Sequence, residues 1–495
     1  MAELERRARV KPIDRRQLLL RPVDVEGLVA AEHPVRAIWE LVGQLDLSGF
    51  YEAIEAVEGE AGRPAIDPRL LISLWIYAYS RGVNSAREVA RLCGHDPAFQ
   101  WLTGMEEINY HTLSDFRVKR KQELDELFAR LLGVLSAEGL VTLERVMHDG
   151  TKVRASAGAD TFRREERIRA HLELARKHVE EMGDPRSEEM SNRVAAARRR
   201  AARERQQRLE KALEELKQIR ATKSDEESKQ QTRASMTDPQ ARIMKQPDGG
   251  HAPSYNVQIS TDAAAGVIVA VGVTQSGSDY RELVPGIERI EANLERLPEQ
   301  MVADGGFTSR ENILSLNEKS IDFVGAMGER EAQSIGQMQR RGISADFYPA
   351  EFAYDAATDT YTCPAAKSLR HDRKETRIGQ IVHQYRAHAA DCQACCFKDR
   401  CCPTAPSKGR AISRRVEDPV VAAFLAKMQT DQAKEIYRRR GAVAEFSNLW
   451  IKAKLGLRQF RLRGLLKTGI EAVWASLTYN FQIWIRLRWR TQWAT

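Results

Sequence analysis

A run of charged, helix-forming residues interrupts a series of strand-like segments, and this order restricts the possible fold more than any other feature. Val141 to His148 is an apolar, strand-like run. From Thr161 to Ala234 the composition changes to Arg, Glu, Lys, Gln and Ala, with apolar residues in a heptad pattern: Ile168, Leu172, Ala175, Val179 and Met182. Strand-like alternation then returns. The pattern predicts a sheet into which a charged helical hairpin, an arm, is inserted, although a merely solvated helical face is the simpler interpretation of the charge.

Strands and helices alternate on the far side of this arm. The predicted strands are Tyr255 to Ile259, Gly266 to Val273, Met301 to Ala303 and Ile321 to Ala326. Helical spacing lies between them, at Leu283 to Leu297 and at Ser309 to Leu316. This mixture predicts an α/β sheet flanked by helices.

The first 140 residues carry only helical patterns. Asp67 is a candidate N-cap with Pro68 behind it, and the segment Ser85 to Cys93 is closed by Gly94. Thr112 or Ser114 is expected to cap a long helix through Phe116 to Leu135. Short helices with basic ends suit a helix-turn-helix module that binds DNA, and a plain helical bundle fits equally well.

The chain changes character twice more before its end. Residues 330–420 are polar and turn-rich and hold six of the seven cysteines, and the chain is helical from Asp418 onward. The predicted domains are an N-terminal helical domain (1–140), a core in two parts (141–158 and 235–329), the arm (159–234), a cysteine-rich insert (330–420) and C-terminal helices that complete the core (421–495).

Three carboxylates are the candidate catalytic residues. Asp149 and Asp304 each follow an apolar strand and precede a glycine, so both are expected at strand ends, where ligands collect in open sheets. Glu445 lies in a predicted helix, Glu435 to Trp450, among several bases. Taken singly, an Asp before Gly is more often a turn former. Together, three carboxylates can hold the two hard cations that phosphoryl transfer on DNA requires.

The chain resembles the DDE transposases of bacterial insertion sequences. The segments that carry the resemblance include His148-Asp-Gly-Thr-Lys152, Ala303-Asp-Gly-Gly-Phe307, Tyr437 to Lys452, His111 to Arg117 and Asp238 to Met244. The resemblance implies an RNase H-like mixed sheet and an enzyme that binds terminal inverted repeats, cleaves at the element ends and joins the 3′ ends to target DNA. It also implies that Asp149, Asp304 and Glu445 hold two Mg²⁺ or Mn²⁺ ions.

The resemblance and the local charge together indicate DNA-binding residues. Tyr437, Arg440, Glu445 and Lys452 match a signature of the family, with one residue more between Arg440 and Glu445 than usual. Arg458, Arg461 and Arg463 follow, with Trp450 and Phe460 among them, as phosphate contacts with stackable aromatics or as a solvated face over core residues. The net charge of +8 favours a polyanionic partner. Double-stranded DNA is the expected partner, bound by a homodimer.

The cysteines point to a metal or to free thiols. Cys392 and Cys395 form a C-x-x-C pair that Cys363 and Cys401 (or Cys402) would complete as a structural zinc site. Disulfides are not expected in this setting.

No run of 18 apolar residues occurs, so no membrane partner is expected, and a cytoplasmic, nucleoid-associated bacterial protein is predicted. The alternatives are a nuclease without strand transfer and a DNA-binding regulator with an inactive core.

Overall fold

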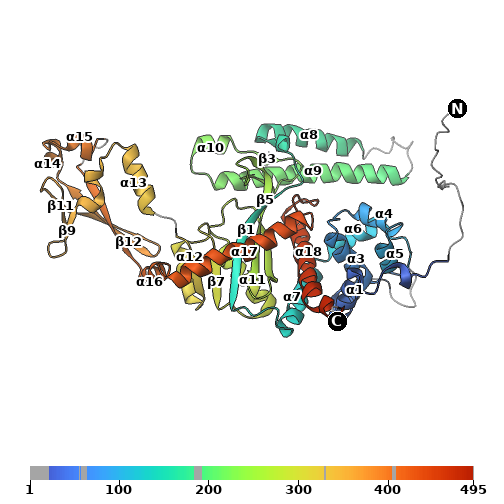
Figure 1. The fold of residues 1–495 in the computed structure, drawn as a ribbon. Helices are drawn as coiled ribbons and strands as arrows, with labels where there is room; N and C mark the ends of the chain where they lie inside the picture. Colours follow the sequence, from blue (N-terminus) through green and yellow to red (C-terminus); the bar gives the residue numbers. More distant parts are fainter. Residues whose placement is uncertain are drawn as a thin grey trace, which may run out of the picture.

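The computed structural model describes residues 22–54, 56, 64–182, 192–327, 330–403 and 409–493. A central sheet has a group of helices at one end, a long helical hairpin along one side and a second sheet at the opposite end (Figure 1). The chain is a mixed α/β protein with a helical N-terminal region and more than one sheet, in agreement with the predicted class. Within the described residues, no helix is long and apolar enough to cross a membrane.

The N-terminal region consists of short helices packed around α3 (Pro68–Ser80), in which Trp75 is completely buried. The predicted cap is confirmed, because the Asp67 side chain accepts a hydrogen bond from the Arg69 amide. The long helix predicted through Phe116 to Leu135 was wrong: the chain breaks at Arg120, and Asn109 caps the first of the two helices that result. The other helices are α1 (Pro34–Gln44), α2 (Ser48–Glu52), α4 (Ala86–Cys93), α5 (Pro97–Thr103), α6 (Tyr110–Lys119) and α7 (Lys121–Ala137).

The central sheet has the strand order β4-β5-β1-β7-β8, and β6 pairs with β5 outside this path. β1 is antiparallel to β5 on one side and parallel to β7 on the other, and β7 is parallel to β8. The predicted strands are therefore present, with β4 in addition. Their bounds are β1 (Arg145–Arg154), β4 (Arg242–Lys245), β5 (His251–Asp262), β6 (Ile268–Thr274), β7 (Gln300–Ala303) and β8 (Asp322–Gly325).

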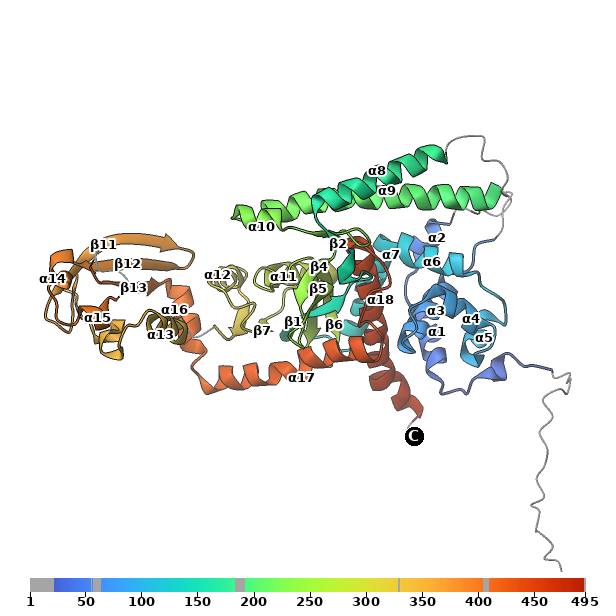
Figure 2. The same cartoon turned by 90° about the horizontal axis from the view of Figure 1, so that it is seen from above.

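Helices cover both faces of this sheet. α11 (Leu283–Leu294) packs under β1, where Gly286 allows close approach to His148, and α12 (Arg310–Glu318) follows β7. α17 (Asp431–Ala453) runs along the other face (Figure 2). α18 (Leu465–Trp484) binds the sheet through Asn480, which accepts from the Ile268 amide (2.9 Å) and donates to the Ile268 carbonyl (2.8 Å). The last helices thus complete a core that begins at β1.

The predicted helical arm is confirmed. α8 (Glu165–Glu181) and α9 (Asn192–Ala221) lie side by side (Figures 1 and 2) and share a small apolar core that includes Ile168, Leu172, Leu209 and Leu216. Beyond them follow α10 (Glu226–Gln230) and a two-stranded ribbon of β2 (Phe162–Arg163) and β3 (Ala234–Ser235) that closes the base of the arm. At this base, Arg242 forms an ion pair of 2.5 Å with the buried Glu215.

A second sheet fills the region from residue 330 to 417, which we call the outer module. The sequence predicted a polar, turn-rich insert with most of the cysteines and no strands here, whereas the chain forms five antiparallel strands in the order β13-β12-β11-β10-β9. Their bounds are β9 (Ala353–Asp355), β10 (Thr360–Thr362), β11 (Ser368–Arg377), β12 (Gln380–Ala387) and β13 (Ala411–Glu417), accompanied by α13 (Arg330–Arg340), α14 (Ala389–Gln393) and α15 (Lys398–Cys401). α16 (Pro419–Lys427) leads back to α17.

Candidate active site

Asp149 and Asp304 occupy matching positions on neighbouring parallel strands. The last parallel pair of β1 and β7 is His148 with Ala303, so the two aspartates are the next residues along each strand. Adjacent strands lie about 4.8 Å apart, which brings the two carboxylates to one edge of the β1–β7 pair. The expectation that β1 ends at Asp149 was wrong. β1 continues to Arg154 because β5 pairs with it along its other side, where Asp149 is opposite Ile259.

The turn after β7 fixes the Asp304 carboxylate. The Gly306 amide donates to Asp304 Oδ1 at 2.7 Å, and Thr308 Oγ1 donates to the Asp304 carbonyl at 3.0 Å. Phe307 is buried with its ring against His148, at 4.8 Å between ring centroids. The two glycines therefore form the tight turn that the sequence predicted.

Helix α17 lies over Asp149 and adds three polar side chains. Asn448 Nδ2 donates to Asp149 Oδ2 at 2.9 Å. The Arg440 guanidinium lies between two acids, with Nη1 3.9 Å from Asp149 Oδ1 and Nη2 3.7 Å from Glu445 Oε1. The Glu445 side chain is 66% exposed and that of Arg440 only 15%. Because Arg440 contacts both acids, it connects Glu445 to Asp149. Sequence reasoning missed Asn448, although its position three residues after Glu445 places it on a neighbouring part of the same helix face.

Burial dominates the electrostatics of this site. Burial raises the pKa of Asp149 to about 6; Arg440 opposes this shift and the charge of Asp304 adds to it. Burial also lowers the pKa of Lys452, opposed by Asp149 and assisted by Lys152. Asp149 and Asp304 repel each other in a site that is partly shielded from water. A bound cation would offset this repulsion.

The oxygen-rich donors fit a hard divalent cation such as Mg²⁺. Asn448 Oδ1 is buried beside Asp149 and accepts no hydrogen bond within the described residues. No group of three or more His, Cys, Asp or Glu side chains in the described part of the chain is arranged so that it could hold a metal ion. Asp149 and Asp304 are only two such groups, and Glu445 is turned toward Arg440 and solvent.

The reverse face of β1 carries a polar network that the sequence did not reveal. Asp279 Oδ1 accepts from Asn256 Nδ2 (2.6 Å) and Gln258 Nε2 (2.8 Å), and Lys152 Nζ lies 3.3 Å from Asp279 Oδ2. A Cβ on Gly150 would lie 2.5 Å from Asp279 Oδ1, so glycine is required for this close approach. His148 belongs to this face, where its ring contacts Ser260 (2.8 Å) and Gln258 (3.1 Å).

The predicted DNA contacts divide into two groups. Tyr437 and Lys452 lie on α17 near the aspartates, with Tyr437 partly buried and the Arg440 guanidinium 5.8 Å from its ring centroid. Arg458, Arg461 and Arg463 are exposed on a loop that pairs with the end of β1 through the Phe460 amide and the Arg154 carbonyl (2.9 Å). Phe460 itself is a core residue packed on Tyr255. A buried acid that the sequence did not suggest, Glu471, supports this loop by accepting from the Arg461 and Leu462 amides.

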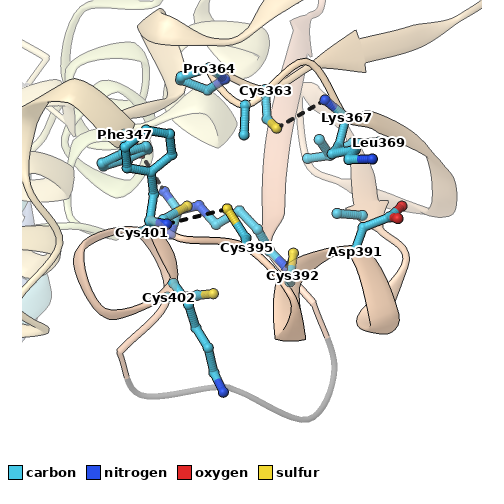
Figure 3. A pocket seen from close by; sticks show the side chains of 15 residues that line it. Phe347, Cys363, Pro364, Lys367, Leu369, Asp391, Cys392, Cys395, Cys401 and Cys402 are labelled. Atoms are coloured by element: carbon cyan, nitrogen blue, oxygen red, sulfur yellow. Dashed lines mark hydrogen bonds between the residues drawn. The ribbon is translucent and has the colours of Figure 1, made fainter.

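The cysteines gather around one small pocket of the outer module (Figure 3). It is lined by Cys363, Cys392, Cys395, Cys401 and Cys402 together with Phe347 and Leu369. The amide of Lys367 donates to Cys363 Sγ, and that of Arg410 to Cys392 Sγ, both at 3.3 Å. Burial raises the pKa of Cys401 to about 12. All seven cysteines are free, and as stated above the described residues show no metal-holding group.

Two family models match the chain. Residues 23–119 match the family described as Transposase domain (DUF772), and residues 362–484 match the family described as Transposase DDE domain. The second match includes α17, with Arg440, Glu445 and Asn448, and neither match reaches Asp149 or Asp304. No curated protein matches the chain.

Proposed function

Because the chain is a DDE transposase of the insertion-sequence kind, we propose that it cleaves phosphodiester bonds at the ends of its element and joins the freed 3′ ends to target DNA. The observation that carries this proposal is the placement of Asp149 in β1 beside Asp304, the residue directly after the adjacent parallel strand β7, with α17 and its Glu445 next to them. A mixed sheet with helices on both faces and this disposition of acids supports an RNase H-like catalytic core.

Asp149 and Asp304 would hold two Mg²⁺ or Mn²⁺ ions, and Glu445 would complete the ligand set. Bound there, the ions supply an activated hydroxyl nucleophile and stabilise the leaving oxygen. Glu445 reaches the aspartates only if its side chain moves away from Arg440. A bound cation favours this movement, because it neutralises the carboxylates in place of Arg440. Arg440 and Lys452 then remain beside the site as donors for DNA phosphates.

The remaining residues orient groups and exclude water. Asn448 holds one oxygen of Asp149, and the Gly306 amide holds one oxygen of Asp304, so both carboxylates are preorganised. The Arg440 guanidinium lies over the ring of Tyr437. The reacting nucleophiles are water in the cleavage step and the DNA 3′-hydroxyl in the joining step, so no side chain forms a covalent intermediate. The helices of residues 22–137 would bind the terminal inverted repeats; residues 23–119 of this segment match the family described as Transposase domain (DUF772).

Alanine variants of the three acids test the catalytic assignment. Asp149→Ala, Asp304→Ala and Glu445→Ala should each abolish Mg²⁺-dependent cleavage of end DNA while end binding stays near normal, since each removes a ligand and little of the DNA contact area. Glu435→Ala is the matched control, because this acid lies on the same helix and its ion pairs within the described residues are with Arg438 and Arg439. Near-normal cleavage by any of the three variants would remove that residue from the site. An end-joining assay separates a transposase from a nuclease that only cuts.

Structural Zn²⁺ in the cysteine pocket is a separate part of the proposal. Its support is that Cys363 lines the same small pocket as Cys392, Cys395, Cys401 and Cys402. Cys363, Cys392, Cys395 and Cys401 would be the ligands, held as thiolates by the metal. Metal analysis of the purified protein should find about one zinc per chain, lost in Cys392→Ser but retained in the control Cys93→Ser, whose buried thiol lies in α4. Protein without zinc would overturn the assignment.

A further inference from the structure

The hairpin that joins β11 to β12 reaches back from the outer module to the catalytic end of the central sheet. We infer that its tip, Arg377 to Gly379, contacts the DNA strand next to the scissile phosphate. This inference rests on the proposed function and gives the outer module a role in substrate binding.

A cleft of about 430 Å³ separates the tip from the active-site turn. One wall consists of Arg377, Ile378 and Gln380, and the opposite wall of Tyr280, Gly305 and the start of α12. Gly305 is the residue directly after Asp304, so the cleft opens beside one of the two aspartates. In this proposal, a DNA strand held at Asp304 continues past this turn into the cleft.

The tip is fixed to the catalytic core. Glu417 of β13 pairs with Arg310 of α12 and accepts from Gln380 of β12, with Arg310 Nε at 2.7 Å. The Asp418 amide donates to the Gly379 carbonyl at 3.0 Å. Gly379 has φ +62°, and a Cβ there would lie 3.1 Å from Arg310 and 3.2 Å from Val421. The turn is therefore seated on α12 and α16, which gives Arg377 and Ile378 defined positions.

The exposed side chains around the cleft suit a DNA strand. The Arg377 side chain is 65% exposed and has one partner in the described residues, Glu375 at 3.0 Å. Such exposed pairs contribute little, so a phosphate can replace the carboxylate at small cost. Ile378 is 60% exposed and Tyr280 46% exposed, which leaves one apolar and one aromatic surface for sugars or bases.

The rest of the hairpin carries exposed positive charges, which attract the phosphate backbone of DNA. Along β11, Arg370, Arg373 and Lys374 are exposed, against the acids Asp372 and Glu375. Nearly the whole of β11 is solvent-exposed on both faces, Leu369 being its one buried residue. A basic, two-sided ribbon that ends at the active site is arranged to follow DNA rather than to pack on protein.

The test is the salt dependence of DNA binding, measured by fluorescence anisotropy without divalent metal. The probes are a duplex with the element's own end and a same-length duplex of unrelated sequence. Arg377→Gln should weaken binding to both about five-fold at about 0.15 M salt, and the slope of log K against log salt should fall by about one, because one phosphate contact is lost. Ile378→Ser should weaken binding with an unchanged slope, because no charge is removed. The control Arg340→Gln removes the same charge from α13 of the same module, away from the cleft.

Footprinting of the complex with hydroxyl radicals locates the contact. Arg377→Gln should lose protection only beside the scissile phosphate. Unchanged affinity and slope, or an effect equal to that of Arg340→Gln, would overturn the inference. The proposed catalytic function fails separately: if the wild-type chain does not cut end DNA in Mg²⁺ while Arg377→Gln still lowers the salt slope, the DNA contact stands and the catalytic assignment does not.

Discussion

At the scale of single residues, the charge on Asp149 costs stability in the metal-free protein. Its pKa rises from the ordinary 3.8 to about 6, so the folded chain binds this proton more tightly than the unfolded chain does. The resulting stabilisation is fully present below pH 3.8 and is lost as the pH rises through 6. A difference of 6 − 3.8, about two pKa units, corresponds to roughly 3 kcal/mol.

We therefore expect Asp149→Asn to stabilise the metal-free protein at neutral pH but not at pH 4. Urea denaturation of both proteins across this range measures the difference, which should grow to at most about 3 kcal/mol above pH 6. Added Mg²⁺ should shrink it, because the wild-type carboxylate then gains a cation. A difference that does not vary with pH would show that ionisation of Asp149 does not destabilise the folded protein.

Gly150 is a second residue with a specific physical role. Gly150→Ala places a methyl group 2.5 Å from Asp279 Oδ1 and 2.7 Å from Gln258 Nε2, where no space exists. We expect a loss of about 1–3 kcal/mol in the free energy of unfolding. Gly133→Ala in α7 is the control, since nothing lies within 4 Å of its new Cβ and the change should stabilise the helix by about 0.5–1 kcal/mol. Equal effects of the two substitutions in thermal denaturation would contradict this explanation.

At the scale of elements, the spacing of apolar residues predicted those helices and strands whose formation depends on local sequence. The arm, β5, β6 and α17 appear in the sequence because their apolar residues repeat with one period over many residues. The break at Arg120 and the strands of the outer module do not appear there. β11 has one buried side chain, Leu369, so it shows no alternation, and its pairing with β12 is decided by partners distant in sequence.

The candidate site shows the same division. Asp149, Asp304 and Glu445 were found through short motifs. Asn448 depends on how α17 packs over β1, and Asp279 depends on which loop reaches the opposite face of β1. Arg440 was expected as a DNA contact, and its position between Asp149 and Glu445 could not be read from spacing. Side-chain direction at a site assembled from four distant segments is a tertiary property.

The attachment of the arm makes an element-scale prediction. Glu215 is buried at its base and pairs with Arg242, with Gln275 3.3 Å away. Glu215→Gln should leave the Arg242 charge without its counter-ion and cost about 1.5–3 kcal/mol. Hydrogen exchange should rise in the last turns of α9 and in β4. The neighbouring Glu214→Gln changes a side chain that is 57% exposed and should alter stability by no more than about 0.5 kcal/mol. Equal exchange in both variants would mean that the ion pair does not fix the arm.

At the scale of the whole molecule, the central sheet carries projections in different directions (Figure 1). The arm has its own apolar core, separate from that of the sheet, and Thr161 and Ser235 at its base are joined by a hydrogen bond of 2.8 Å. The arm is therefore free to contact a second molecule without disturbing the catalytic core. The proposed function requires two ends to be cut and inserted together, and closed two-fold symmetry is the commonest way to hold two cores.

We expect the protein to be at least a homodimer when bound to end DNA, with the arm needed for pairing the ends. Replacing residues 164–233 by a short linker should leave folding and single-end binding intact, because the ends of the deleted segment are adjacent. Size-exclusion chromatography with light scattering, without and with end DNA, measures the assembly. If the shortened protein still pairs two ends, the arm has no such role; if one copy cuts one end at full rate, the dimer is unnecessary.

The order of the candidate site residues along the chain has a consequence for when that site can form. Asp149 and Glu445 are 445 − 149 = 296 residues apart, and the helix that binds the Ile268 backbone through Asn480 comes later still. During synthesis the ribosome releases the arm and the outer module before α17 and α18 exist. A nascent chain thus presents the exposed arginines of the arm before the residues of the candidate site can come together.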